Sequence, residues 1–260
     1  MHSLRYAPPR KAFVEQIMGL PFSIHVRGAA AHEAYVERAA EAAFTHLRHC
    51  DALFSTYDPS SEISRINDGT LALTDADPLI HQVLTLGDAA RHRTGGLFDL
   101  HLPGLDGRLR LDPSGIVKSW AAQGAFTRMA LDDLDICLNA GGDVVVSSST
   151  GGPGWRIGIE NPDSPNELIG VLKRSHGGVA TSGSQARGAH LIDPRDGSHP
   201  SSLRQVSVTG PCLVQADVLA TAAFVHGLGA AEWVQQFAGY EALVVSSDGA
   251  LTATPGLILC

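Results

Sequence analysis

The chain of 260 residues has few cysteines and no paired cysteine motif. Cys50, Cys137, Cys212 and Cys260 stand far apart, without a CxxC spacing. This spacing indicates neither a zinc site nor a disulfide framework, and it is typical of buried or incidental thiols in a reducing compartment. No stretch approaches the roughly 18–20 apolar residues of a membrane span, and the N-terminal segment lacks a signal-peptide core. We therefore expect a cytoplasmic location and no membrane span.

Charged residues are also scarce, and no basic stripe is visible. They make up 18% of the sequence, and the formal net charge is −8. Nucleic-acid-binding proteins usually carry a basic face, so that class is not favoured. The hydrophobic content of 44% is enough for one large domain or two small ones with a buried core. An acidic protein that binds a polyanion needs a local cation or helix N-termini at the site.

Hydrophobic periodicity predicts both helices and strands. Residues 1–12 are interpreted as a flexible lead-in, residues 13–260 as a single domain, and residues 97–111 as loop-rich. Helices are predicted at 30–53, 78–93, 115–130, 214–228 and 230–238, and Ser60–Ser61–Glu62 could cap a further short helix. Strands are predicted at 22–26, 134–138, 143–148, 155–159, 168–173, 178–181, 205–209, 242–246 and 249–253. Because strands outnumber helices and do not alternate strictly with them, the pattern favours an α+β fold over a doubly wound sheet.

One pair of oxygen-bearing side chains lies on a predicted helix. In VQADVLATAAFVHG, Asp217 and Thr221 stand at positions i and i+4 and therefore share one helix face. A carboxylate and a hydroxyl suit Mg²⁺, which completes its coordination with water and phosphate. Taken alone, a solvated aspartate and a threonine bonded to its own helix backbone would be the commoner arrangement.

A second candidate is the segment LDPSGIVKSW. Asp112 precedes a Pro–Ser–Gly turn at the start of a predicted helix, where free N–H groups attract anions. Lys118 follows one to two turns later and could meet a phosphate or a ring edge. The carbonyl of Gly115 could face a ligand, since glycine has no Cβ. A capped helix with a surface lysine explains the same residues.

Two further segments are less specific. In CLNAGGDVVV two glycines permit a sharp turn or a close backbone contact, but the phosphate-loop pattern GxxxxGK[ST] is absent. In GGVATSGSQARGAHLIDP, Ser182, Ser184 and His190 would suit a hydrolase. No G-x-S-x-G elbow is present, so a serine nucleophile is not favoured. His190 is instead a candidate proton acceptor or ring contact.

The order of these segments resembles the ApbE family, the FAD:protein FMN transferases. The similar elements span nearly the whole chain: MG at 18–19, STY at 55–57, SEISRIN at 61–67, TGGLFD at 94–99, DPSGIVK at 112–118, NAGGD at 139–143, ATSG at 180–183, HLIDPRDG at 190–197 and ADVLATA at 216–222. Each element alone is weak, whereas the shared order is specific. The chain departs from the family pattern in its short stretches between Asp99 and Asp112 and between Gly183 and His190. It also has Ser119 and Gln123 where the family has Gly and Asp.

The resemblance implies an α+β fold, similar to a T-fold, with mixed or antiparallel sheets, packed helices and a flavin-binding cleft. The implied reaction is the Mg²⁺-dependent transfer of FMN from FAD to a Thr or Ser hydroxyl of an acceptor flavoprotein that carries D-x-x-[ST]-G-A-[ST], with release of AMP. An FAD pyrophosphatase and a non-catalytic FAD-binding protein remain alternatives, because they would use the same residues. The implied site residues are Met18, Tyr57, Leu97, Phe98, Asp99, Asp112 and Lys118 for FAD, Gly115, Asp217 and Thr221 for Mg²⁺, and His190 as the catalytic base.

Overall fold

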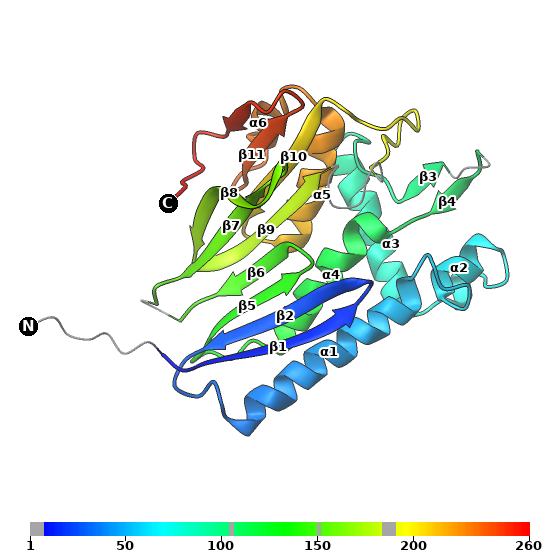
Figure 1. Cartoon of the computed structure of the whole chain (residues 1–260). Coiled ribbons are helices and arrows are strands. Elements are labelled where there is room, and N and C mark those ends of the chain that lie inside the picture. Colours follow the sequence, from blue (N-terminus) through cyan, green and yellow to red (C-terminus); the bar gives the residue numbers. More distant parts are fainter. Residues whose placement is uncertain (1–7, 104–106, 150–151, 184–190) are drawn as a thin grey trace, which may run out of the picture.

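An antiparallel sheet forms the centre of the fold (Figure 1), in a computed structural model that describes residues 8–103, 107–149, 152–183 and 191–260. Within these residues the sheet has eight strands, and each neighbouring pair is antiparallel. In spatial order they are β1 (Arg10–Ile17), β2 (Leu20–Arg27), β5 (Asp135–Ala140), β6 (Asp143–Ser147), β9 (His176–Gly183), β10 (Leu203–Gly210), β11 (Glu241–Ser246) and β12 (Leu251–Ala253). The predicted α+β class is therefore confirmed.

Helices cover one face of this sheet (Figure 1). The described helices are α1 (Ala34–Phe54), α2 (Glu62–Asn67), the 3-10 turn Leu73–Asp75, α3 (Pro78–Arg93), α4 (Ser114–Arg128), α5 (Leu213–His226) and α6 (Ala230–Val234). Helix α5 packs on β9 and β10 and against α4, and it is buried along most of its length. Its sequence is apolar on nearly every side, as expected for a helix enclosed by other elements. Among the described residues, no helix combines the length and the hydropathy needed to cross a bilayer.

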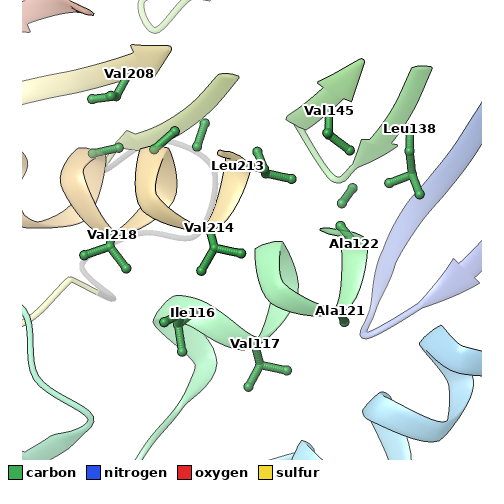
Figure 2. Close-up of a cluster of buried hydrophobic side chains, with 14 of the residues drawn as sticks. Ile116, Val117, Ala121, Ala122, Leu138, Val145, Val208, Leu213, Val214 and Val218 are labelled. Carbon is green, nitrogen blue, oxygen red and sulfur yellow. The ribbon is translucent and has the colours of Figure 1, made fainter. Parts of the chain in front are cut away.

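The main core lies between α4, α5 and the sheet. Figure 2 shows Ile116 and Val117 of α4 beside Val214 and Val218 of α5, all of them buried. Each such side chain contributes about 1.5–3 kcal/mol when it is removed from water. This packing fixes the first turns of α4 and α5 relative to each other. The site described below is built on the first two turns of α4 and the first three turns of α5.

A glycine allows α5 to approach the sheet closely. A Cβ on Gly178 of β9 would lie 2.6 Å from the Cα of Leu213 and 2.9 Å from its backbone nitrogen. Backbone cannot move aside as a flexible side chain can, so this position accepts only glycine without a shift of the helix. Leu213 is the first residue of α5, and Asp217 lies about one turn further along.

Two hairpins lie outside the main sheet. The first consists of β7 (Trp155–Asn161) and β8 (Ser164–Arg174). It packs on the sheet face opposite the helices through a second apolar cluster that includes Val144, Ile157 and Leu172. The other hairpin pairs β3 (His101–Pro103) with β4 (Leu109–Leu111).

The structure corrects several predicted boundaries. Strand β1 begins at Arg10, inside the segment 1–12 that was predicted as a lead-in, and β3 and β4 form within the stretch predicted as loop-rich. Helix α6 ends at Val234, whereas the periodicity extended it to residue 238. By contrast, α3 covers the predicted range 78–93, and the Ser61 side chain accepts the Ser64 N–H as the N-cap of α2.

Candidate functional site

A cavity of about 420 Å³ lies where the start of α4 and the second and third turns of α5 face the turn between β5 and β6 and the end of β9. Glycines and small polar side chains, among them Gly141 and Ser182, form part of its wall. Eight predicted site residues line it: Leu97, Phe98, Asp99, Asp112, Gly115, Lys118, Asp217 and Thr221. The fold thus brings together residues from three separate segments of the chain.

A second cavity of about 410 Å³ adjoins the first. Gly19, Leu20, Ser114 and Lys118 line both cavities. Apolar side chains at the end of α1 and in α4, Phe54 and Val117, form part of its wall. The two remaining predicted residues that the structure describes, Met18 and Tyr57, also line this cavity. We call the first the polar cavity and the second the apolar cavity.

All ten predicted site residues within the described part of the chain therefore line one of these two cavities. The eleventh, His190, lies outside the described residues. These ten residues come from segments that are far apart in the sequence, and other residues complete the lining of both cavities. Their convergence supports the choice of residues, while the ligand contacts assigned to each remain predictions.

The turn between β1 and β2 presents Met18 to the apolar cavity. Met18 and Gly19 have φ values of 54° and 69°, the left-handed geometry of a two-residue type I′ hairpin turn. The N–H of Met18 donates to Oδ2 of Asp51 at 3.0 Å. Since Asp51 belongs to α1, this bond ties the turn to the helix layer. Asp51 also lines the apolar cavity and was not among the predicted residues.

Lys118 is held at the junction of the two cavities by a buried carboxylate. Its Nζ lies 2.7 Å from Oδ2 of Asp143, which is 1% exposed. Oδ1 of Asp143 accepts the N–H of Thr181 at 3.1 Å. Asp143 ends the NAGGD element but was not among the predicted site residues. A charged residue at the start of the buried segment DVVV requires a partner. This requirement could have identified Asp143 from the sequence.

Asp217 and Thr221 lie on the α5 face that lines the polar cavity, as their spacing predicted. Asp217 is 6% exposed. The hydroxyls of Thr221 and Ser182 share a hydrogen bond of 3.0 Å, which links α5 to β9. Among the described residues, no three side chains of His, Cys, Asp or Glu gather in a metal-binding group. The predicted Mg²⁺ ligands would instead combine one carboxylate with a hydroxyl and a backbone carbonyl.

Two further aspartates border the polar cavity, one of them just before the start of α4. Oδ1 of Asp112 accepts the Ser114 N–H at 3.0 Å, which satisfies one of the free donors of the first turn of α4. Asp99 forms an ion pair of 2.9 Å with Arg91 and accepts the N–H of His101. Both carboxylates are thus fixed in orientation where they border the polar cavity.

An aromatic ring packs against the start of α4. A Cβ on Gly115 would lie 3.2 Å from Cε2 of Phe98, which is closer than a side chain ordinarily tolerates. Phe98 is 3% exposed, and its N–H donates to the Thr94 hydroxyl at 3.1 Å. The glycine therefore makes room for the ring as well as for any ligand of its carbonyl.

Fold and site together define an α+β protein with two adjoining cavities at the end of a helix-covered antiparallel sheet. The family model described as ApbE family matches residues 18–108 and 101–244. The match covers well over half of the sequence, and the chain belongs to the ApbE family.

Solved structures of the same family share this fold. The ApbE protein of Thermotoga maritima superimposes with a TM-score of 0.80 at 20% identity, covering 95% of this chain and 97% of its own. The flavinyl transferase ApbE of Pseudomonas stutzeri gives 0.80 at 20% identity, over 96% and 97%. The flavin transferase ApbE of Vibrio cholerae gives 0.76 at 18%, over 95% and 98%. No curated protein sequence matches the chain.

Proposed function

We propose that this protein transfers FMN from FAD to a Thr or Ser hydroxyl of an acceptor protein in a Mg²⁺-dependent reaction that releases AMP. The observation that carries the proposal is the convergence of all ten described candidate residues on two adjoining cavities. The solved relatives that are named as flavin transferases support the transfer of a flavin.

The chemistry of the cavities suits the two parts of FAD. The isoalloxazine ring is flat and largely apolar, and the apolar cavity offers Met18, Phe54, Tyr57 and Val117. Tyr57 is 97% exposed, so its ring is available to a ligand from the solvent side. The diphosphate carries the negative charge, and Lys118 lies between the two cavities where the ring and the phosphates would join.

Three oxygen donors in the polar cavity fit a Mg²⁺ ion. The Asp217 carboxylate, the Thr221 hydroxyl and the Gly115 carbonyl are hard donors, and Mg²⁺ takes the rest of its coordination from water and phosphate. An ion held by these residues would supply positive charge against the diphosphate. Helix α5 keeps the carboxylate and the hydroxyl on one face, about one turn apart.

The proposed step is a displacement at phosphorus. The acceptor hydroxyl oxygen forms a bond to the FMN-side phosphorus, the bond from that phosphorus to the bridging oxygen breaks, and AMP leaves. The hydroxyl proton must pass to a base, because a hydroxyl is a weak nucleophile at neutral pH. We assign that role to His190. The product is FMN joined to the acceptor through a phosphoester.

A mass assay tests the proposal. The protein is incubated with FAD, MgCl₂ and a synthetic peptide that carries D-x-x-[ST]-G-A-[ST], and the peptide is expected to gain one FMN while AMP appears in equal amount. In the matched control peptide, each Ser and Thr of the motif is replaced by Ala. Release of FMN and AMP without a peptide would identify an FAD pyrophosphatase instead. Tight FAD binding without turnover would identify a binding protein.

A further inference from the structure

A third cavity, of about 290 Å³, lies on the sheet face opposite the helices. Its floor includes His25 of β2 and Cys137 of β5, and its wall is the β7 segment from Arg156 to Glu160. Among the described strands β7 pairs only with β8. The Glu160 carbonyl accepts a hydrogen bond from Nε2 of Gln205 at 3.1 Å, so the edge that is open to a further strand is the β7 segment before Glu160. We call this cavity the β7 groove.

The β7 groove meets the polar cavity at the rim of the sheet. Thr181 lines both cavities, and the adjacent glycines Gly141 and Gly142 line one each. The regular antiparallel pairing of β6 with β9 ends at Val144 and Val179. Beyond that point the N–H of Thr181 donates to the side chain of Asp143. The two strands therefore separate where the groove and the cavity meet.

We propose that the β7 groove binds an extended segment of the acceptor protein as a strand added to β7, which leads the acceptor hydroxyl past Thr181 into the polar cavity. This inference rests on the proposed function. FAD would occupy the polar and the apolar cavity, which we together call the flavin-side cavities. The second substrate therefore has to enter through an adjoining opening. Strand addition supplies affinity through the main chain, and pockets for alternate side chains supply selectivity.

The side chains of the groove define the kind of segment that fits. Arg156 and Glu160 are exposed on the same side of β7, four residues or about 13 Å apart. Arg156 favours an acidic side chain in the bound segment at the end away from the polar cavity. Glu160 favours a basic side chain at the end near the polar cavity. The inner positions of the segment would contact Cys137 and Val144 and extend the second apolar cluster. The occupant is thus an amphipathic extended peptide.

Another open strand edge beside a large cavity, at β1, does not meet these conditions. Strand β1 borders a cavity of about 550 Å³ whose lining includes Phe13, Glu15 and Glu41, but none of its lining residues belongs to the flavin-side cavities. Glu15 and Glu41 are moreover paired with Arg48. A peptide bound there would have no direct path to the polar cavity.

Hydrogen exchange on the intact protein tests the assignment without requiring turnover. The probe is the synthetic peptide with D-x-x-[ST]-G-A-[ST], lengthened on each side by six residues in which apolar and polar side chains alternate. It is added to saturation in the presence of FAD and without Mg²⁺. Amide exchange in residues 155–161 is expected to slow at least tenfold, while residues 10–17 stay unchanged. Protection confined to β1, or no protection of β7 at saturation, would overturn the proposal.

Charge reversal provides a second readout with a matched control. Arg156→Glu should raise the KM for the peptide roughly fivefold and leave the affinity for FAD unchanged. Lys173 is the cross-strand partner of Arg156 on β8 and does not line the groove. Lys173→Gln removes a neighbouring positive charge without placing a carboxylate opposite Arg156, so it should leave the peptide KM unchanged. Equal effects of the two variants would contradict the proposal. FMN transfer without slower exchange in β7 would refute peptide binding in the β7 groove but not the proposed function. Slower exchange in β7 without FMN transfer would refute the proposed function but not peptide binding in the groove.

Discussion

Lys118 and Asp143 form an ion pair of 2.7 Å that joins α4 to the start of β6 across the site. The Asp143 carboxylate is almost fully buried, whereas the Lys118 side chain is 20% exposed and lines both flavin-side cavities. The pair therefore directs a cation to the point where the ring and the diphosphate of FAD would meet. A lysine on a long flexible side chain gains its position from such a partner.

The first prediction concerns Asp143→Asn. The amide can still accept the Thr181 N–H, but it no longer neutralises Lys118. We expect the KM for FAD to rise about tenfold, because the lysine loses its fixed position. The free energy of unfolding should fall by about 1–3 kcal/mol, below the usual cost of breaking a fully buried pair, because the lysine can reach water. Steady-state kinetics and urea unfolding measure the two effects.

A double-mutant cycle separates this role from a general loss of structure. Lys118→Met removes the cation and keeps the apolar length of the side chain. If Asp143 acts through Lys118, adding Asp143→Asn to Lys118→Met should change the KM for FAD by less than twofold. Additive effects on KM would show that the two residues act independently and would contradict the positioning role.

The second prediction concerns Gly115→Ala. Alanine is favoured in helices by about 1 kcal/mol over glycine, yet the new methyl would lie 3.2 Å from Cε2 of Phe98. We expect little change in the melting temperature and a loss of FAD affinity, because the ring must move into the polar cavity. Fluorescence quenching of FAD measures that affinity. Phe98→Leu removes the conflicting ring atoms, so the double variant should bind FAD better than Gly115→Ala alone.

The candidate site residues could be named from the sequence because the order of the short segments that carry them resembles one family. Asp217 and Thr221 are one helical turn apart, and the order of the segments made their chemistry specific. Asp143 escaped prediction because its partner Lys118 is distant in the sequence, and only the pairing of β6 beside α4 brings them together. Asp51 was missed for the same reason, since its role depends on the distant turn at Met18.

The fold was predictable where burial imposes a clear period. Helix α3 has a proline at its start and a basic last turn, and its predicted range was confirmed. Strand β1 was not predicted, because it lies at the sheet edge, where Lys11 and Glu15 alternate with exposed residues and pair with side chains of α1. Strands β3 and β4 have three residues each, too few for a period to be visible.

The third prediction concerns Thr221→Val, which keeps the shape of the side chain and removes its hydroxyl. We expect the Mg²⁺ concentration for half-maximal FMN transfer to rise at least tenfold, because a proposed ligand is lost. Ser182→Ala removes the hydrogen-bond partner of Thr221 but no proposed ligand, so its shift should be smaller. Equal shifts in the two variants would indicate that only the hydrogen bond between them matters. A Mg²⁺ titration of the mass assay measures both.

The last prediction concerns His46, which packs half-buried between α1 and α4. A Cβ on Gly124 would lie 2.5 Å from its Nε2, and the Trp120 ring lies 6.1 Å away. Burial, with a smaller contribution from Arg128, lowers the pKa of His46 to about 4. In the unfolded chain its pKa returns to about 6.5.

Between these two pKa values the unfolded state therefore binds more protons than the folded state. The stability contributed by neutral His46 is complete above about pH 6.5 and is lost as the pH falls towards 4. After allowance for partial solvent exposure, the loss should be about 1–3 kcal/mol. Urea unfolding at several pH values between 4 and 7 measures it. His46→Gln should flatten this part of the pH dependence, whereas an unchanged slope would show that other groups produce it.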